Sequence, residues 1–264
     1  MTGLVPPVFR FRIYEGHPIR AGFSTRSGGV SSGCFSTLNL GLHVGDEPNH
    51  VIENRHRFCT SLGVGAETLV CGEQVHGNRV AVVDRSDLGR GAFDKDTAIP
   101  LTDAMVTGQR GVSLAAFFAD CVPLFFYDPE RHVIGLAHAG WRGTESRIGL
   151  ETVRVMEEQF GSAPQHLLAA FGPSIGACCY VVGDAVRTRF EAVFGPDSGI
   201  LRRAGKIWML DLWAANRLVL LEAGLRPANI ESAGVCTACN AGEFFSHRAH
   251  NGQTGRQAAL ITLE

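Results

Sequence analysis

The feature that most constrains the fold is a series of short apolar runs in the first half of the chain, rich in β-branched and aromatic residues. Runs of this kind predict buried β-strands. They cover residues 68–71, 79–83, 111–118, 122–127 and 133–138. His76 follows the first run, Cys121 separates two of them, and His138 ends the last. Because residues at strand ends of one sheet can converge, these three side chains are candidates for a shared site.

Helical patterns surround these strands. Residues 49–63 place their apolar side chains roughly on one face, with Asn49 as the expected N-cap. The clearest helix covers residues 211–224, with Asp211 as its N-cap and a glycine at its end. Other helices are expected over 144–160 and 183–194, and other strands over 8–14, 19–24, 167–173 and 259–263. Without repeats or a linker, the pattern predicts a single mixed α/β domain over residues 1–264.

Length and composition indicate a globular protein. The chain has 264 residues, of which 45% are hydrophobic and 19% charged. Its net charge of -2 gives no electrostatic case for binding nucleic acid or an anionic membrane. No apolar run approaches the roughly 20 residues that cross a bilayer, and residues 1–12 lack the pattern of a signal peptide. We therefore expect a cytoplasmic monomer whose eight cysteines are reduced thiols.

Three segments combine a metal-binding side chain with small or turn-forming residues. They are EQVHG at residues 73–77, ADCVP at 119–123 and AHAGWRG at 137–143. Together they supply two imidazoles and one thiolate, from His76, Cys121 and His138. Such a set would hold zinc and leave the fourth position of its tetrahedron for water or substrate, which is typical of catalytic zinc.

Charged residues near these segments suggest further roles. Asp120 lies in so apolar a run that its carboxylate needs a partner. Either Asp120 or Glu73 could move protons, as a glutamate that is not a ligand does in zinc deaminases. Guanidinium groups suit phosphate, and the candidates for holding it are Arg26, Arg55, Arg142 and Arg248.

A C-x-x-C motif at Cys236 and Cys239 is a possible redox pair or half of a zinc site. A structural zinc would need a second pair of ligands, and His247 with His250 could provide it. The adjacent cysteines 178–179 are interpreted as structural.

From Gly22 to Leu263 the sequence resembles the bacterial laccase-domain family. That family is also called the peptidoglycan editing factor or purine nucleoside phosphorylase family, and was formerly described as polyphenol oxidase. The resemblance rests on motifs in a shared order: FSTRSGGV from Phe23, LNLG from Leu38, GDEPNHVIENR from Gly45, EQVHG from Glu73, TDA from Thr102, ADCVP from Ala119, AHAGWRG from Ala137, FGPSIG from Phe171, Cys236-Thr237, FSHR from Phe245 and TGR from Thr254.

The resemblance implies a compact α/β fold with mixed sheets flanked by helices, and zinc held at the positions of His76, Cys121 and His138. It implies phosphorolysis of adenosine, inosine and methylthioadenosine to base and sugar 1-phosphate, with adenosine deamination as a second activity. Purine nucleoside and phosphate are thus the expected partners. Asn39, within LNLG, joins the candidate substrate-binding residues. The family pattern does not require a cysteine at position 239, so the C-x-x-C is a departure from it, and its interpretation as a metal site is discounted.

Three other functions use the same residues. A copper oxidase needs clustered histidines for several coppers, whereas this chain has ten histidines and no H-x-H pair. Copper could still bind adventitiously, because it outcompetes zinc at nitrogen and sulfur ligands. A metal-free thiol hydrolase would use Cys121 as nucleophile, activated by His138 or His76. In a non-catalytic module the zinc would only hold the fold, and the protein would recognise a cell-wall precursor or a partner.

Overall fold

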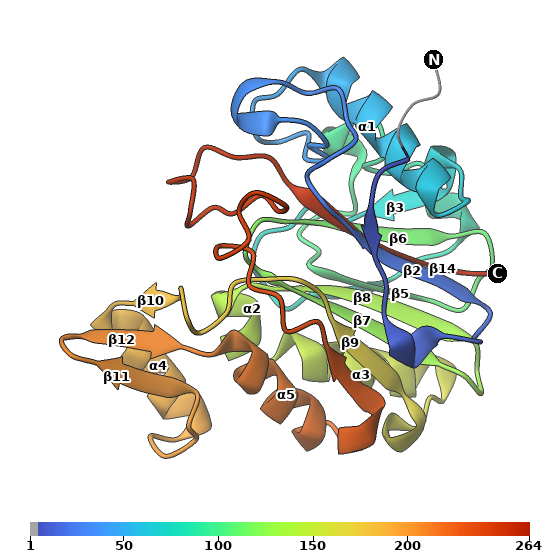
Figure 1. The fold of residues 1–264 in the computed structure, drawn as a ribbon. Coiled ribbons are helices and arrows are strands. Elements are labelled where there is room, and N and C mark those ends of the chain that lie inside the picture. Colours follow the sequence, from blue (N-terminus) through green and yellow to red (C-terminus); the bar gives the residue numbers. More distant parts are fainter. Residues whose placement is uncertain (1–4) are drawn as a thin grey trace.

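Two larger β-sheets lie face to face at the centre of the molecule, and helices cover their outer faces (Figure 1). The structure is a computed structural model, and it describes residues 5–264. Residues 1–4, part of the stretch predicted to carry no signal peptide, lie outside the described residues. The predicted mixed α/β class is confirmed.

The first sheet has five strands, and only its β3–β6 pair is parallel. In spatial order these strands are β1 (Val8–Phe9), β2 (Ile19–Ser24), β14 (Gln257–Leu263), β6 (Ser113–Phe118) and β3 (Leu69–Cys71). The second sheet has six strands, with parallel pairs at its two edges and antiparallel pairs between them. Its strands are β13 (Ile230–Ser232), β9 (Leu168–Phe171), β7 (Val122–Asp128), β8 (Val133–Ala139), β5 (Ala104–Thr107) and β4 (Val80–Val82).

Apolar side chains from both sheets form the core between them, among them Phe118 of β6 and Phe125 of β7. The residues of β6, β7 and β8 are all buried. Strands covered on both faces are apolar at consecutive positions, and this explains why the runs at 111–118, 122–127 and 133–138 do not alternate with polar residues.

Helices cover the outer faces of the two sheets. Against the five-stranded sheet lies α1 (Pro48–Ser61), and against the six-stranded sheet lie α3 (Ile148–Phe160) and α5 (Leu212–Glu222). The short α2 (Trp141–Glu145) follows β8 directly. In the described part of the chain, seven short 3-10 helices occupy loops, at Arg12–Tyr14, Gly33–Phe35, Ala66–Thr68, Arg85–Asp87, Lys95–Thr97, Pro164–His166 and Pro227–Asn229.

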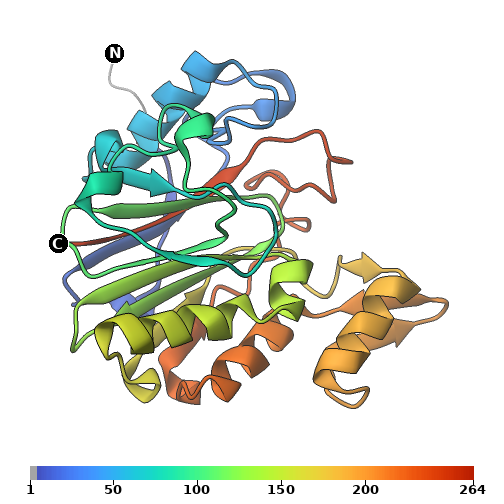
Figure 2. The ribbon, with the colours of Figure 1, turned by 180° about the vertical axis from the view of Figure 1, so that it is seen from behind.

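A smaller unit stands beside the two sheets (Figure 2). It consists of α4 (Asp184–Phe194) and a three-stranded antiparallel sheet. The strands of that sheet are β10 (Val181–Val182), β12 (Ile207–Leu210) and β11 (Leu201–Ala204). No helix in the described part of the chain is both long and apolar enough to cross a membrane.

Most predicted elements are present, and the exceptions have local causes. The side chain of Asp211 caps α5 as expected, by accepting from the N–H of Ala214 at 2.9 Å. The single helix predicted over 144–160 is wrong, because Arg147 has a left-handed backbone (φ 62°) that separates α2 from α3. Asn49 is not the N-cap of α1, because the helix already begins at Pro48. The ring of a proline suits the first position of a helix. The strand predicted over 8–14 ends at Phe9.

Candidate metal centre

The site lies where the chain passes from one large sheet to the other. Strand β6 ends at Phe118, and residues 119–121 lead into β7 of the second sheet. Asp120 takes a positive φ of 85° at this crossing. Its carboxylate accepts hydrogen bonds from the hydroxyl of Thr237 and the backbone N–H of Arg248, both at 2.7 Å. These two bonds fix the crossing and thereby the position of Cys121.

His138 approaches from β8, the strand that pairs with β7. The residue is buried, with 3% of its surface exposed. Its Nδ1 lies 2.9 Å from Oδ1 of Asp103. A carboxylate accepts only, so Nδ1 carries the proton and Nε2 is left free for a metal, as in the carboxylate–histidine–metal arrangement.

The same carboxylate holds the loop that carries His76. Asp103 accepts from the backbone N–H groups of Val75, His76 and Gly77 at 2.8–3.0 Å. His76 has a left-handed backbone with φ 61°, a conformation that needs such support in a residue other than glycine. Asp103 therefore positions two of the three candidate ligands.

Sequence reasoning gave Asp103 no role, although it lies in the TDA motif. The available signal was a carboxylate directly before the apolar run 104–107. A buried carboxylate needs hydrogen-bond donors, and here three backbone N–H groups and one imidazole provide them.

The structure brings the predicted ligand set together. The ligand atoms of His76, Cys121 and His138 all lie within 4.8 Å of one another. A Cβ atom added at Gly140 would lie 3.0 Å from both the Sγ of Cys121 and the ring of His76. The glycine thus allows the backbone after β8 to pass directly behind the ligands. Two imidazoles and one thiolate in this arrangement fit a zinc ion.

Cys121, which is half-buried, and the buried His138 form an ion pair when no metal is bound. Burial raises the pKa of Cys121, but the charge of His138 and the hydrogen bonds to His138 and His76 together lower it to about 6. Burial lowers the pKa of His138, but the Cys121 thiolate and the hydrogen bond to Asp103 raise it to about 9. Near neutral pH the pair is therefore a thiolate and an imidazolium. The thiolate is already in the form that binds a metal.

The ligand set opens onto a cavity of about 740 Å³. Its lining includes His76, Cys121 and His138, with His76 exposed and His138 buried. One side of the set thus faces the cavity, where the fourth position of a tetrahedral ion would lie. Cavities of this volume accept molecules of nucleoside size.

Three of the four arginines predicted to hold phosphate line the cavity, but not all of them present a free guanidinium to it. Arg142 and Arg248 line it, and so does Arg55. The guanidinium of Arg55 is buried, and it donates to the carbonyl oxygens of Leu40, Gly91 and Ala92 at 2.6–2.9 Å. It thus supports the loops behind the cavity wall.

Two predicted substrate-binding residues do not line the cavity. Arg26 donates to the carbonyl oxygens of Ser36 and Ala241. The side-chain oxygen of Asn39 accepts from the backbone N–H groups of Gly41 and Arg256. Both side chains hold loops together through contacts that local sequence does not reveal.

Both candidate acids line the cavity. Glu73 is exposed, and its Oε2 accepts from the backbone N–H of Leu101 at 3.0 Å. Asp120 lies next to Cys121 and has 8% of its surface exposed. Its carboxylate is held more firmly than that of Glu73, by the two hydrogen bonds described above.

Several lining residues were not predicted. Aromatic and apolar walls come from Phe117, Trp141 and Tyr180, and polar groups come from His43 and Arg256. Burial and the charge of Arg256 lower the pKa of His43 to about 4, so this imidazole is neutral at physiological pH. No sequence motif around His43 indicated its position, because it reaches the site only through the loop after LNLG.

The prediction that the C-x-x-C motif could share a metal with His247 and His250 is wrong. His247 lines the large cavity, and Nδ1 of His250 lies 2.9 Å from the carbonyl oxygen of Ser246. Cys236 and Cys239 lie instead beside the adjacent cysteines 178–179.

Proteins named as nucleoside-processing enzymes are similar to this chain in sequence, and the solved structure of one such relative is similar in fold. Purine nucleoside phosphorylase YlmD of Bacillus subtilis is 41% identical over 245 residues, covering 92% of this chain and 88% of that protein. Adenosine deaminase RL5, from an unknown prokaryotic organism, is 37% identical over 238 residues, covering 89% of this chain and 90% of that protein. The crystal structure of YlmD from Geobacillus stearothermophilus, 42% identical, matches with a TM-score of 0.92 over 96% of this chain and 94% of that chain.

The family model described as multi-copper polyphenol oxidoreductase laccase matches residues 20–264. This match covers nearly the whole described structure, including all three candidate ligands. The chain therefore belongs to this laccase-like family, to which its motifs had pointed.

Proposed function

We propose that the protein is a zinc-dependent purine nucleoside phosphorylase with adenosine deamination as a second activity. One observation carries the proposal: a three-ligand His–Cys–His set faces a cavity that also contains Arg142 and Arg248. The relatives named purine nucleoside phosphorylase and adenosine deaminase support the same chemistry. Adenosine, inosine and methylthioadenosine are the proposed substrates, with phosphate as the second reactant.

The donor set favours zinc over the several coppers of the family's descriptive name. Two imidazoles and one thiolate make a single site. Within residues 5–264, the other group that could hold a metal contains cysteines alone, whereas multi-copper chemistry requires clustered imidazoles. Copper would bind the same set adventitiously, because it outcompetes zinc for such ligands. Zinc held there would supply Lewis acidity and lower the pKa of a water molecule to about 7.

Arginine side chains would hold the phosphate. Phosphorolysis transfers the sugar from the purine nitrogen to a phosphate oxygen, so phosphate must lie beside the anomeric carbon. Arg142 and Arg248 line the cavity that contains the metal ligands, and a guanidinium presents paired donors to phosphate oxygens. The Arg142 guanidinium lies 4.4 Å from the ring centroid of Trp141, a contact that restricts where its donors can reach.

Aromatic walls would bind the base. Phe117, Trp141 and Tyr180 line the cavity, and aromatic rings stack on purines. His43 is neutral at physiological pH because its pKa is about 4. It could therefore both donate to and accept from a purine or a sugar hydroxyl.

A carboxylate would move the proton that deamination requires. Asp120 is proposed first, because its position beside Cys121 is fixed by Thr237 and Arg248. Glu73, at the exposed edge of the cavity, is the second candidate. Replacing each acid by its amide separates them: the variant that lowers deamination at unchanged zinc content identifies the proton carrier.

The direct test is an assay of inosine with phosphate for release of hypoxanthine. Protein purified without added metal should contain zinc, and its hypoxanthine release should require phosphate and be abolished by chelation. Cys121→Ala should lose both the zinc of this site and the activity. Activity in a Cys121→Ala protein that lacks this zinc would exclude the proposed function.

Arg142 and Arg189 offer a matched pair for the phosphate role. Both guanidinium groups contact the ring of Trp141, at 4.4 and 5.7 Å, but only Arg142 lines the cavity. Arg142→Ala should raise the KM for phosphate by about tenfold or more, since a charge-assisted hydrogen bond contributes about 1.5–3 kcal/mol. Arg189→Ala should leave that KM unchanged. Equal effects of the two variants would remove Arg142 from the phosphate site.

A second candidate function has its own support. The metal-free thiolate and imidazolium of Cys121 and His138 are the arrangement of a thiol nucleophile with its acid. A thiol hydrolase would survive chelation and be lost to a thiol alkylator. The phosphorylase should show the opposite response to chelation, so the two treatments distinguish the candidates.

A further inference from the structure

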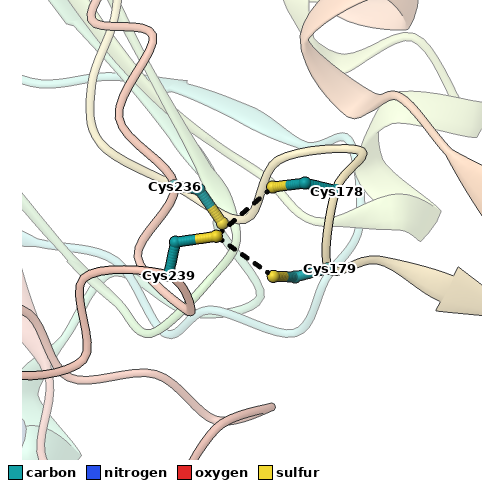
Figure 3. Close-up of side chains that lie close together, drawn as sticks. All are labelled: Cys178, Cys179, Cys236 and Cys239. Carbon is teal, nitrogen blue, oxygen red and sulfur yellow. Dashed lines mark hydrogen bonds between the residues drawn. The ribbon is translucent and has the colours of Figure 1, made fainter.

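Four cysteines from two segments that are far apart in the sequence lie close together at the turn that precedes Tyr180. The sulfurs of Cys178, Cys179, Cys236 and Cys239 all lie within 4.8 Å of one another. The Sγ of Cys239 is 3.5 Å from that of Cys178 and 3.4 Å from that of Cys179. Figure 3 shows the four side chains directed toward a common centre. Such convergence is not required for packing, because two of the cysteines, Cys178 and Cys239, are exposed.

Backbone hydrogen bonds build this arrangement before any ligand is present. Ser174 and Cys236 form an isolated parallel bridge, in which the N–H of Thr237 donates to the carbonyl of Ser174 at 3.0 Å. A turn follows in each segment, closed by bonds from Cys179 N–H to Gly176 and from Asn240 N–H to Cys236. The first turn lets adjacent cysteines point the same way, which an extended chain would prevent.

Gly176 is needed for this close approach. A Cβ atom at that position would lie 3.3 Å from both the Sγ of Cys178 and the Cβ of Cys236. Its backbone N–H also donates to the Sγ of Cys236 at 3.3 Å. A backbone N–H that donates to the sulfur would orient Cys236 as a metal ligand.

The spacing of the sulfurs matches a metal site better than a disulfide. Zinc–sulfur bonds of about 2.3 Å place the corners of a tetrahedron about 3.8 Å apart. The observed separations of 3.4 and 3.5 Å are close to that value. A disulfide would require sulfurs about 2.05 Å apart, and would leave the other two cysteines without a role.

We propose that Cys178, Cys179, Cys236 and Cys239 form a second metal site, which binds one zinc ion with four thiolate ligands. Four protein ligands complete the tetrahedron, so this zinc is structural and has no open position. The site is separate from the His–Cys–His set and does not depend on the proposed enzymatic function.

The second zinc would join a segment of the cavity wall to the segment that holds Asp120 in place. One segment continues into Tyr180, and the other contains Thr237, the hydroxyl of which holds Asp120. Arg248 also reaches the first segment, by donating to the carbonyl oxygen of Cys179 at 3.3 Å. An ion held between these segments would restrict the motion of Arg248, a candidate for binding phosphate. It would also restrict the motion of residues 119–121, which carry Cys121 from β6 to β7.

Zinc content per chain tests the proposal on the full-length protein, kept reduced and loaded with zinc. Wild-type protein should bind about two zinc ions, and Cys239→Ser and Cys121→Ala should each bind about one, at different sites. Cys34→Ser removes an exposed cysteine elsewhere and should bind about two. Cobalt in the Cys121→Ala protein should give the intense thiolate charge-transfer absorption of a tetrahedral sulfur site. Adding Cys239→Ser to that protein should abolish the absorption.

Two results would overturn the proposal. In one, Cys239→Ser binds as much zinc as wild-type protein. In the other, the reduced wild-type protein binds a single zinc that Cys121→Ala removes entirely. Loss of phosphorolysis in Cys121→Ala with retention of one zinc would support the second site whatever the enzymatic function proves to be.

Discussion

At the scale of single residues, Asp103 connects the fold to the candidate metal centre. Its carboxylate orients His138 and holds the backbone around His76. Asp103→Asn should lower zinc affinity at this centre by about 10–100-fold, as loss of a partner behind a metal-binding histidine does. Competition with a chromophoric chelator measures the change, in a Cys239→Ser background that removes the second site.

Asp128→Asn is the matched control for Asp103→Asn. Asp128 is also buried at a strand end, and its Oδ1 accepts from the N–H groups of Glu130 and Arg131. The control keeps the Oδ1 acceptor for both N–H groups and should keep its zinc affinity. If both variants changed affinity equally, Asp103 would act through general stability alone.

The protonation of Cys121 and His138 predicts how zinc binding depends on pH. Between the pKa of Cys121 at about 6 and that of His138 at about 9, the Cys121–His138 pair of the metal-free site holds one proton more than its metal-bound form, on Nε2 of His138. Zinc requires a neutral imidazole, so binding in this range should release about one proton and affinity should rise with pH. Above the pKa of His138 the release should vanish. Below that of Cys121 a second proton should be released.

Calorimetric titrations with zinc, in buffers of different ionisation enthalpy, count these protons. The Cys239→Ser protein is suitable, because thiols of the second site would release protons of their own. A release of no protons near neutral pH would contradict the ion pair between Cys121 and His138.

At the scale of secondary structure elements, the start of α2 determines how closely the backbone approaches the metal ligands. Gly140 is the N-cap of α2, and a Cβ there would lie 3.0 Å from the Sγ of Cys121 and from the ring of His76. Gly140→Ala should therefore weaken zinc binding at this centre, by displacing one ligand or the other. Zinc titration of the variant measures the loss.

Gly183→Ala is the control for the effect of a methyl group at a helix start. Gly183 is the N-cap of α4, has a similarly extended backbone, and has nothing within 4 Å of the added Cβ. Its zinc affinity should match that of wild-type protein. If Gly140→Ala bound zinc as tightly as Gly183→Ala, the ligands would have more room than the structure gives them.

Strand and helix predictions succeeded where the residue pattern within one segment is enough to define the element. The apolar runs 122–127 and 133–138 matched β7 and β8 because both faces of these strands are buried. The four-residue β5 was missed, since so short a strand is defined by its partners in the sheet. The break between α2 and α3 depends on the left-handed backbone conformation of Arg147, and no helix-breaking residue at that position predicts it.

The candidate site was predictable in part for the same reason. His76, Cys121 and His138 are recognisable as candidate ligands from residue type and position at strand ends. Asp103 and His43 were missed because they reach the site through tertiary contacts. Arg26 and Asn39 were predicted to bind substrate, and in the structure their side chains hold loops together outside the cavity lining.

At the scale of the whole molecule, the C-terminal strand is central to the fold. Strand β14 lies between β2 and β6, so its formation joins the two ends of the chain in one sheet. Leu260 in β14 is fully buried. Leu260→Ala should lower the free energy of unfolding by about 2–5 kcal/mol, the range for a leucine truncated in a packed core. Denaturant unfolding monitored by circular dichroism gives the value.

Leu218→Ala is the corresponding control on the surface. This leucine lies on α5 with 39% of its surface exposed, and its truncation should change stability by no more than about 0.5 kcal/mol. A similar loss in both variants would show that β14 is less tightly packed than the sheet order implies.

Anomalous diffraction from crystals of the zinc-loaded protein tests the open metal centre most directly. Data collected on both sides of the zinc absorption edge should place an ion among His76, Cys121 and His138, with its remaining side facing the cavity and free of protein atoms. The four-cysteine zinc would give a separate peak and leave this test unaffected. No zinc among the three side chains, or a fourth protein atom bound to that ion, would contradict the account.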